Sequence, residues 1–577
     1  MRNSYLFILI IILILAYYLI STYRQNYSSS VIEDPDIIII GLGTAGSVLA
    51  RRLNDALPRK RILVLEQGMD LSSSSTVYNV FNGMEAAYNT NFSSVLPVDN
   101  PNVKASVGKM FGGSSSHNFG LTVHGSPWFY ENEWCPILNL PYQDMIPYIK
   151  GIERYSGTTQ SPMLRGLNGM IEVSQLPVKA TLHFEKLLSK VNTQGLSLLW
   201  KAINIYGNLG PLRASDKFSK VFIDSLTNIS PNLEIVKDYN VVNNCICVDQ
   251  QLFVDPVTGI RQSVDISYLP DTYRLRNKGK LDIRGGCQVD KILHNGIGVI
   301  YNGGIIQKLK PNGRIIVCGG GIFSPHLLLK SGFKNSYIGR NLKTHYGSQI
   351  IMSIEADDTD NFNFSGGPIA FLPLNTGDDL PDKRDLQILV SGGPLLNTDL
   401  LKVVGIDFNA ERIKNPRKRF FCFIVWTLRP NINGSVELNE NDNSLPVIKL
   451  NMFENTKDSL TIIKAIKGLY AVALGMKQTY SSLKVVFPPE NAFNNGGNDR
   501  TLFDYVKKGI SMTDHYSCTC ALGKVVNPKD FALYEDPRTH VVDASVFPAI
   551  ADGNTEYPVC LMAEIAADRI ISSIISQ

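Results

Sequence analysis

The chain has 577 residues, 44% of them hydrophobic, and a formal net charge of +4 at pH 7. This length allows a large buried core and predicts two or three domains. The charge is small and spread along the chain without a basic stripe, which argues against a nucleic-acid partner. The nine cysteines show neither a disulfide framework nor a zinc-ligand spacing, so no metal site is expected.

The N-terminal residues 5–23 carry no charge and are long enough for one transmembrane helix. The apolar run is long and no A-x-A-like site follows it, which favours an uncleaved anchor over the cleaved signal peptide of a secreted protein. Arg2 and Arg24 flank the run and nearly balance, so the orientation stays undetermined. We expect a single-pass membrane anchor over residues 1–23 and a polar linker over residues 24–34.

The folded region opens with an apolar strand over Ile37–Ile40, and Gly41, Gly43 and Gly46 follow it as G-x-G-x-x-G. The first glycine permits a tight turn, and the second lets the backbone approach a pyrophosphate. The third lets the next helix pack close to the strand. That helix is expected over Thr44–Asn54, with its N-terminal N–H groups directed at the phosphates.

A second apolar strand, Arg61–Leu65, ends in Glu66, twenty residues after Gly46. A carboxylate at this position can accept hydrogen bonds from both ribose hydroxyls of an adenosine. Strand, glycines, helix, strand and acid in one register therefore predict a dinucleotide that contains ADP. The pattern does not distinguish NAD from FAD, but its place near the head of the chain favours a flavin domain.

A long polar stretch, residues 69–107, has few periodic signals and leads into a segment of small and polar residues, 108–125. Gly112 and Gly113 permit close backbone approach, and the serines that follow them offer hydroxyl groups. This segment is expected to lie against a ligand.

The middle of the chain returns to the dinucleotide domain near residues 314–332. An apolar strand over Ile315–Val317 meets three glycines and then a helix expected to start at Ser324–Pro325, with proline at its first helical position. Before this crossing, short strands are expected near Leu252–Val254 and within Leu281–Leu293.

The following region reads as the main substrate domain. Its alternating pattern predicts strands, and a longer apolar periodicity predicts one helix near Leu460–Gln478. The strands are expected at Gln349–Ile354, Asp385–Val390 and Arg419–Trp426. The chain then closes with an amphipathic helix that ends near Ser573.

These segments together resemble the glucose–methanol–choline oxidoreductases, a family of FAD-dependent alcohol oxidases and dehydrogenases. The resemblance covers nearly all of residues 35–577 in order: the Gly41–Gly46 pattern with Glu66, then GGSSSHN, GGGIFSPHLLLKSG, IGRNLKTH and VVDASVFP followed by GNT. It implies an α/β fold, with a Rossmann-like FAD-binding domain built from discontinuous segments and an α+β substrate domain with a large antiparallel sheet. The chain departs from the family pattern at Gly120, His124, Cys518 and Leu522, so the wall of the pocket is expected to be remodelled.

The resemblance also implies the domain boundaries and the residues of the site. FAD-binding segments are expected at 35–175, 276–347 and 501–577, a mixed and mostly substrate-side segment at 176–275, and the substrate domain at 348–500. The implied cofactor-binding residues are Gly41, Gly43, Thr44, Ala45, Gly46, Glu66, Gly112, Gly113, His117, Asn118, Val289, Asp543 and Ala544.

The implied chemistry is oxidation of a CH–OH group, with hydride transfer to flavin N5 and loss of the hydroxyl proton. His515 occupies the position of the family's base, and Asn554 the position that holds the substrate oxygen. The implied partners are a small-molecule alcohol and an electron acceptor, either O2 or a quinone or protein. The isolated histidines His124, His345 and His540 are expected to be structural.

His117 leaves two interpretations open. In choline-oxidase-like sequences the residue before the motif's asparagine is a histidine that can hold the flavin covalently, and the alternative is a noncovalent contact. Two other functions also stay open: a flavin-binding structural or surface protein with little catalysis, and an enzyme that resembles hydroxynitrile lyases.

Overall fold

The computed structural model describes residues 34–80, 83–176, 214–355, 362, 364, 366–374, 383–392, 396–493 and 499–576. The predicted membrane anchor lies outside these residues, as does all of the predicted linker except its last residue. The predicted domain boundaries remain a proposal.

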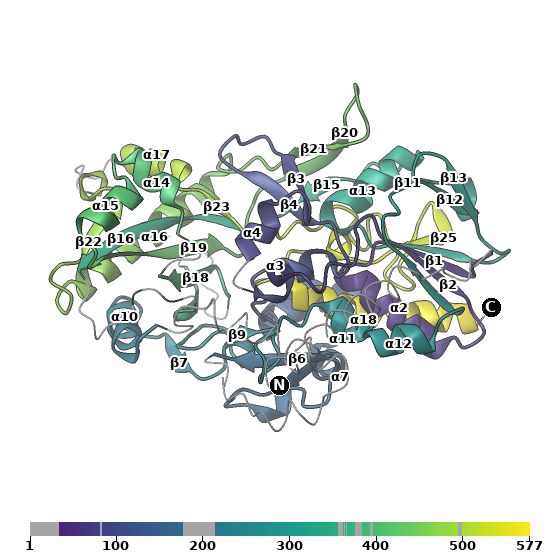
Figure 1. Ribbon diagram of the computed structural model, residues 1–577, viewed down its shortest axis with the longest axis horizontal. Coiled ribbons are helices and arrows are strands. Elements are labelled where there is room, and N and C mark those ends of the chain that lie inside the picture. The colour runs from purple at the N-terminus through teal and green to yellow at the C-terminus, as the bar shows by residue number, and fades with distance from the viewer. Residues whose placement is uncertain are drawn as a thin grey trace, which may run out of the picture.

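A six-stranded sheet has the order β10-β2-β1-β14-β25-β24 and takes its strands from three distant parts of the chain (Figure 1). All neighbouring strands are parallel except β24 and β25, which pair antiparallel. The central strands β1, β2 and β14 are buried along their whole length, which explains why they are apolar throughout except for Arg314 at the start of β14. The strands are β1 (Ile37–Ile40), β2 (Ile62–Leu65), β10 (Leu281–Arg284), β14 (Arg314–Val317), β24 (Ala532–Leu533) and β25 (Asp536–Val541).

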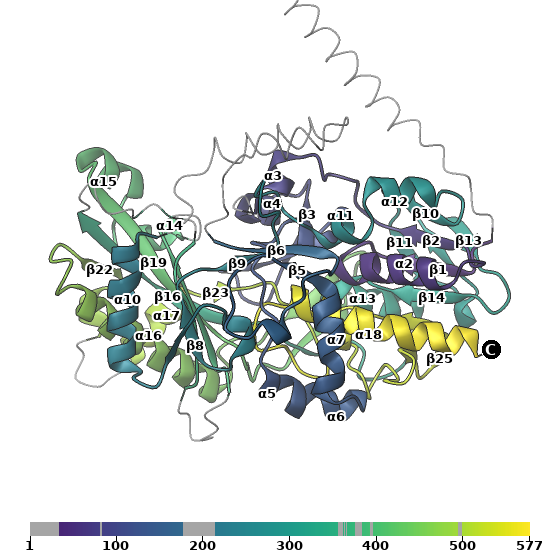
Figure 2. The same ribbon diagram turned by 90° about the horizontal axis from the view of Figure 1, so that it is seen from below.

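Two long helices from opposite ends of the chain pack side by side in this part of the molecule. Helix α2 (Thr44–Ala56) follows the glycine pattern, and α18 (Glu556–Ile575) closes the chain (Figure 2). Arg52 of α2 joins them through ion pairs with Glu564 and Asp568 of α18. The expected helices at both places are confirmed, each extending two residues beyond its predicted end.

The predicted start of the second glycine-linked helix is wrong. Helix α13 runs over Gly320–Ser331, so it begins four residues before Ser324 and carries Pro325 in its interior. A proline there leaves the carbonyl group four residues earlier without its helical partner. In this chain that carbonyl belongs to Gly321, and the hydroxyl of Thr519 donates to it at 2.7 Å.

A second, larger sheet has the order β22-β16-β19-β18-β17-β8-β7, with β23 paired to β16. Its neighbours are antiparallel except β7 and β8, so the sheet is mixed rather than purely antiparallel. The three strands predicted in this region are confirmed. The strands are β7 (Glu234–Val236), β8 (Cys245–Cys247), β16 (Tyr346–Glu355), β17 (Ile369–Leu372), β18 (Leu386–Ser391), β19 (Lys418–Thr427), β22 (Lys484–Phe487) and β23 (Ser511–Met512).

Helices α10 (Asp216–Ile229), α16 (Thr456–Met476) and α17 (Arg500–Lys508) pack beside this sheet. Among the described residues, α16 is the one helix whose length and apolar composition would allow it to cross a membrane. Half of its most apolar window is buried, and Ile462, Ile466 and Leu469 contact the core formed with β16 and β19. Its apolar residues are therefore used in packing.

Smaller elements surround the two sheets. The polar stretch before the glycine–serine segment contains two short helices and a hairpin, although its sequence shows little periodicity. The strand expected near Leu252–Val254 is reduced to the two residues of β9. These elements are α3 (Ser75–Tyr78), α4 (Gly83–Tyr88), β3 (Ser93–Pro97), β4 (Lys104–Gly108), α5 (Pro127–Phe129), α6 (Cys135–Leu138), α7 (Tyr142–Ile152), β5 (Glu153–Tyr155), β6 (Ile171–Gln175), β9 (Gln251–Leu252), α11 (Val264–Tyr268), α12 (Asp271–Arg276), β11 (Val289–Ile292), β12 (Gly298–Tyr301), β13 (Ile305–Lys308), β15 (Arg340–Leu342), α14 (Thr398–Val403), α15 (Phe408–Lys414), β20 (Gly434–Leu438) and β21 (Pro446–Lys449).

Candidate active site

A cavity of about 820 Å³ lies between the two sheets. One side is formed at the carboxyl ends of β1, β2 and β14, which is where open α/β sheets bind their ligands. The other side includes Gln349, Leu389 and Trp426 from the larger sheet. The volume is within the range of ligand pockets, roughly 300–1,000 Å³. All the predicted site residues line this cavity except Gly46 and Gly112.

At several glycine positions beside the cavity the backbone leaves no space for a side chain. Gly41 has a φ of +98°, and a Cβ atom there would lie 2.5 Å from the carbonyl oxygen of Cys318. A Cβ atom on Gly113 would lie 2.9 Å from the Cα atom of Gly43, so these two segments meet at backbone distance. Gly46 does not face the cavity; a Cβ atom there would collide with the carbonyl of Gly41. The third glycine thus serves helix packing, as its position in the pattern predicts.

Two buried carboxylates organise the backbone around the glycine-lined end of the cavity. Glu66 accepts the N–H groups of Leu42 at 2.9 Å and Gly68 at 2.8 Å, and burial raises its pKa to about 7. Asp543 accepts the N–H of Gly320 at 2.9 Å and the hydroxyl of Ser324. Each carboxylate therefore fixes a chain turn while still lining the cavity, where Val289 and Ala544 also lie.

Asn118 is held entirely by protein groups. Its amide nitrogen donates to Glu556 at 2.5 Å, and its amide oxygen accepts from the buried guanidinium of Arg261 at 2.8 Å. The loop that carries Asn118 is thereby tied to the start of α18. Sequence reasoning identified Asn118 but neither Arg261 nor Glu556, because both partners are remote in sequence and belong to no glycine pattern.

His117 precedes Asn118 and is 4% exposed. Among the described residues neither of its ring nitrogens has a hydrogen-bond partner. Burial, reinforced by the nearby charge of Arg261, lowers the pKa of His117 to about 3, so its ring is neutral. A neutral, unpartnered imidazole in the cavity wall is available for contact with a ligand.

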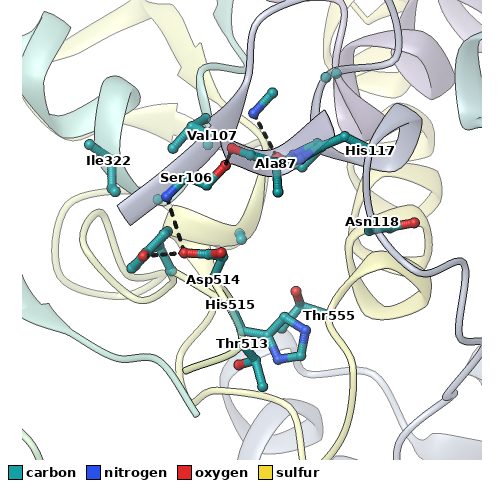
Figure 3. Close-up of a pocket in the computed structure, with 18 of the residues that line it drawn as sticks. Ala87, Ser106, Val107, His117, Asn118, Ile322, Thr513, Asp514, His515 and Thr555 are labelled. Carbon is teal, nitrogen blue, oxygen red and sulfur yellow. Dashed lines mark hydrogen bonds between the residues drawn. The ribbon is translucent and has the colours of Figure 1, made fainter. Parts of the chain in front are cut away.

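His515 lies across the open space from His117 and Asn118 (Figure 3). Its Nδ1 atom lies 2.8 Å from Nδ1 of His345, so one of these nitrogens carries the shared proton and the other accepts it. Burial lowers the pKa of His515 well below its ordinary value, and His345 adds to this effect. His345, expected from the sequence to be structural, is therefore the direct partner of the candidate base.

Asn554 completes this polar group. Its amide nitrogen lies 3.5 Å from Nε2 of His515, and its amide oxygen accepts from the side chain of Gln387 at 3.0 Å. Gln387 donates to the amide oxygen of Asn554, so the amide nitrogen of Asn554 is the group that faces Nε2 of His515. Because that nitrogen is a donor, Nε2 acts as the acceptor, and the ring proton lies on Nδ1, facing His345. Gln387 lies on β18, in a strand pattern that gives no sign of a site.

These residues fit a flavin dinucleotide. Gly43 and Thr44 line the cavity at the N-terminus of α2, where helix N–H groups can bind a pyrophosphate, and Glu66 lines it at the end of the next strand. His117, whose ring nitrogens have no hydrogen-bond partner in the described part of the chain, lines the same cavity as His515. The cavity thus joins a dinucleotide cradle to a candidate acid–base group.

Comparison with known proteins identifies the class. The N-terminal model of the GMC oxidoreductases matches residues 35–347, and their C-terminal model matches residues 430–563. The chain therefore belongs to the GMC oxidoreductase family. Its cofactor is FAD, and it is an enzyme of the oxidase and dehydrogenase type, as the sequence predicts.

Individual relatives are distant. The chain is 24% identical to an oxygen-dependent choline dehydrogenase of Staphylococcus saprophyticus, over 93% of this chain and 94% of that protein. It is 22% identical to a 5-(hydroxymethyl)furfural oxidase of Methylovorus sp., over 93% of this chain and 98% of that protein. A solved pyridoxine 4-oxidase from Mesorbium loti has a TM-score of 0.69 at 16% identity, covering 93% of this chain and 99% of that one. This structural likeness confirms the α/β fold.

Proposed function

We propose that this enzyme oxidises the CH–OH group of a small alcohol, with His515 as the base and Asn554 as the group that orients the substrate oxygen. The observation that carries this proposal is the arrangement of the two side chains. Nε2 of His515 and the amide of Asn554 lie 3.5 Å apart on one wall of the cavity that also holds the dinucleotide cradle. The distant relatives named for choline and hydroxymethylfurfural support the substrate class.

The chain's own residues would divide the work as follows. Nε2 of His515 takes the hydroxyl proton of the alcohol, and a positioned base of this kind typically contributes about 10²–10⁴ in rate. His345 holds the Nδ1 proton of His515, so that Nε2 stays free to accept. Asn554 donates to the substrate oxygen, and Gln387 fixes the orientation of its amide. The oxidising equivalent would come from bound FAD, whose chemistry is to accept a hydride.

His117 would contact the flavin, either through a covalent bond from one ring nitrogen or through a noncovalent contact. Denaturation of the full chain in acid distinguishes the two. Colour that stays with the precipitated protein and is lost in His117→Ala supports the bond, and colour released by both proteins supports the contact.

Anaerobic mixing with a panel of primary and secondary alcohols tests the proposed reaction. We expect the visible absorption of the flavin to bleach in the native protein and far more slowly in His515→Gln. If no alcohol bleaches the flavin, the proposal fails. A lyase would then release a carbonyl compound without bleaching, and a structural flavoprotein would release none.

The electron acceptor and location complete the proposal. Relatives are named both as an oxygen-dependent dehydrogenase and as a glucose dehydrogenase that uses FAD and quinone, so both O2 and a quinone are candidate acceptors. We propose membrane attachment through residues 1–23, and fractionation of the full chain beside a variant that lacks these residues tests it.

A further inference from the structure

Basic side chains gather at the amino ends of the strands in the six-stranded sheet. Since β1, β2 and β14 are parallel, the turns that precede them lie side by side. These turns are residues 34–36, 57–61 and 309–313. Two backbone hydrogen bonds fix the arrangement: the N–H of Asp36 donates to the carbonyl of Arg61 at 2.9 Å, and the N–H of Lys310 donates to the carbonyl of Pro35 at 3.1 Å. The basic residues of the three turns, here called the basic edge, are Arg59, Lys60, Arg61 and Lys310.

The positive charge of the basic edge exceeds the negative charge of its turns. Asp36 pairs with both Lys60 at 3.4 Å and Lys310 at 3.0 Å. Burial acts in the opposite direction, but the N–H of Arg61 and the two lysines lower the pKa of Asp36, so this carboxylate is ionised at neutral pH. Asp34 is the other acid of the three turns, so four positive charges face two negative ones. The side chains of Lys60 and Lys310 remain 40% and 37% exposed.

The basic edge is also the place where the chain enters the folded region. Asp34 is the first residue of that region, and its carbonyl accepts the guanidinium of Arg61 at 3.0 Å. Residues 24–33 join Asp34 to the proposed anchor over residues 1–23. Ten residues span at most about 36 Å. The basic edge therefore has to stay within that distance of the end of the proposed anchor.

An exposed isoleucine lies beside these charges. Ile297 is 50% exposed, and its carbonyl accepts the N–H of Leu309, the neighbour of Lys310, at 3.0 Å. Cations next to an exposed apolar side chain suit the boundary between anionic headgroups and acyl chains. The cavity lies at the opposite, carboxyl ends of the strands, and Figure 2 shows β1 and β2 at the end of the molecule remote from β16 and β19. A lipid surface at the basic edge would therefore not cover the cavity.

We propose that the basic edge binds anionic lipid headgroups and holds the folded region against the membrane, with the cavity remote from the lipid. The proposal rests on the proposed membrane attachment through residues 1–23, and it adds the docking surface and the class of lipid. Each Lys or Arg near an anionic lipid surface contributes about fivefold in binding. The surplus of two charges therefore favours docking on anionic over neutral lipid by about 30-fold.

The test measures acylation of Lys60 and Lys310 in the full-length holoenzyme by an uncharged, water-soluble reagent. Lys402 of α14, which is also paired with an aspartate, serves as the internal reference. The protein is reconstituted with vesicles of phosphatidylcholine alone, or of phosphatidylcholine with phosphatidylglycerol, at about 0.1 M salt. We expect Lys60 and Lys310, relative to Lys402, to react about 10- to 30-fold more slowly with the anionic vesicles, and this difference to disappear at about 1 M salt. Equal rates with both kinds of vesicle overturn the inference.

The double variant Arg59→Gln, Arg61→Gln removes the surplus of two charges and keeps both reporter lysines. Arg61→Gln retains an N–H donor for the carbonyl of Asp34. We expect the ratio of the labelling rates in the two kinds of vesicle to fall to within about threefold of unity. The matched control is Arg412→Gln, Lys414→Gln, which removes two exposed cations of α15 and should keep the native ratio. A native ratio in the Arg59 and Arg61 variant contradicts the assignment to the basic edge.

The anchor and the docking surface fail in different ways. Flotation of the full chain with phosphatidylcholine vesicles tests the anchor alone, because the basic edge has no preference for neutral lipid. If the chain does not float, the anchor is wrong, and the labelling comparison still decides the basic edge. If double-stranded DNA slows the labelling of Lys60 and Lys310 while anionic vesicles do not, the surface binds nucleic acid and the assignment to lipid is wrong.

Discussion

Replacing His345 with leucine removes the partner of the candidate base while leaving the base in place. In the native protein the two Nδ1 atoms lie 2.8 Å apart, and the rings cross at 88°. His345 is completely buried, so no water is at hand to replace its nitrogen. The variant therefore leaves the Nδ1 proton of His515 without an acceptor.

The expected cost follows from this geometry. A buried polar group that loses its partner costs about 1–3 kcal/mol. At about 1.4 kcal/mol per factor of ten, the productive tautomer and orientation of His515 would be disfavoured by roughly 5- to 150-fold. We expect the rate of anaerobic flavin reduction by a saturating alcohol to fall by that factor in His345→Leu, with little change in flavin content.

His345→Asn is the matched control, because its amide retains a hydrogen-bond acceptor near the position of Nδ1. We expect this variant to keep the native rate within about tenfold. A leucine variant that binds flavin fully and is reduced as fast as the native protein would show that His345 does not position the base.

Three further predictions concern the support of the site. Glu153→Gln removes one of the two carboxylates that pair with the buried guanidinium of Arg165, the one at 2.7 Å, while Asp238 remains at 3.0 Å. The free energy of unfolding in denaturant should therefore fall by about 1–3 kcal/mol. Since Arg165 lowers the pKa of Glu153, the contribution of this carboxylate to the free energy of unfolding should be present at neutral pH and lost as the pH falls and Glu153 is protonated. If the native protein and the variant lose stability equally on acidification, this expectation is wrong. Gly46→Ala forces α2 away from β1, and equilibrium dialysis should show much weaker flavin binding; native affinity would mean that the helix can shift without cost. Gln387→Leu frees the amide of Asn554 to rotate, so flavin reduction should slow by roughly tenfold at unchanged flavin affinity, and an unchanged rate would remove Gln387 from the site.

The dinucleotide end of the site is determined by local sequence. Gly41 must adopt a positive φ, and Gly46 must lack a side chain so that α2 can pack on the strand. Both requirements concern residues that are close together in the sequence, so they appear there as the G-x-G-x-x-G pattern. The buried parallel strands can also be predicted from the sequence, because burial on both faces favours continuous apolar runs. The family resemblance added His515 and Asn554, which the structure brings to one wall.

Only the tertiary structure decided the partners of these residues. His345 and His515 are 170 positions apart, Gln387 and Asn554 are 167 apart, and Arg261 reaches Asn118 from 143 positions away. The sequence pattern of one segment does not predict which buried polar side chains it will contact, because each pair forms only when separate segments pack together. The early start of α13 also depends on a distant residue. Pro325 leaves the carbonyl of Gly321 without its helical donor, and the hydroxyl of Thr519 takes that place, so the proline is tolerated inside the helix.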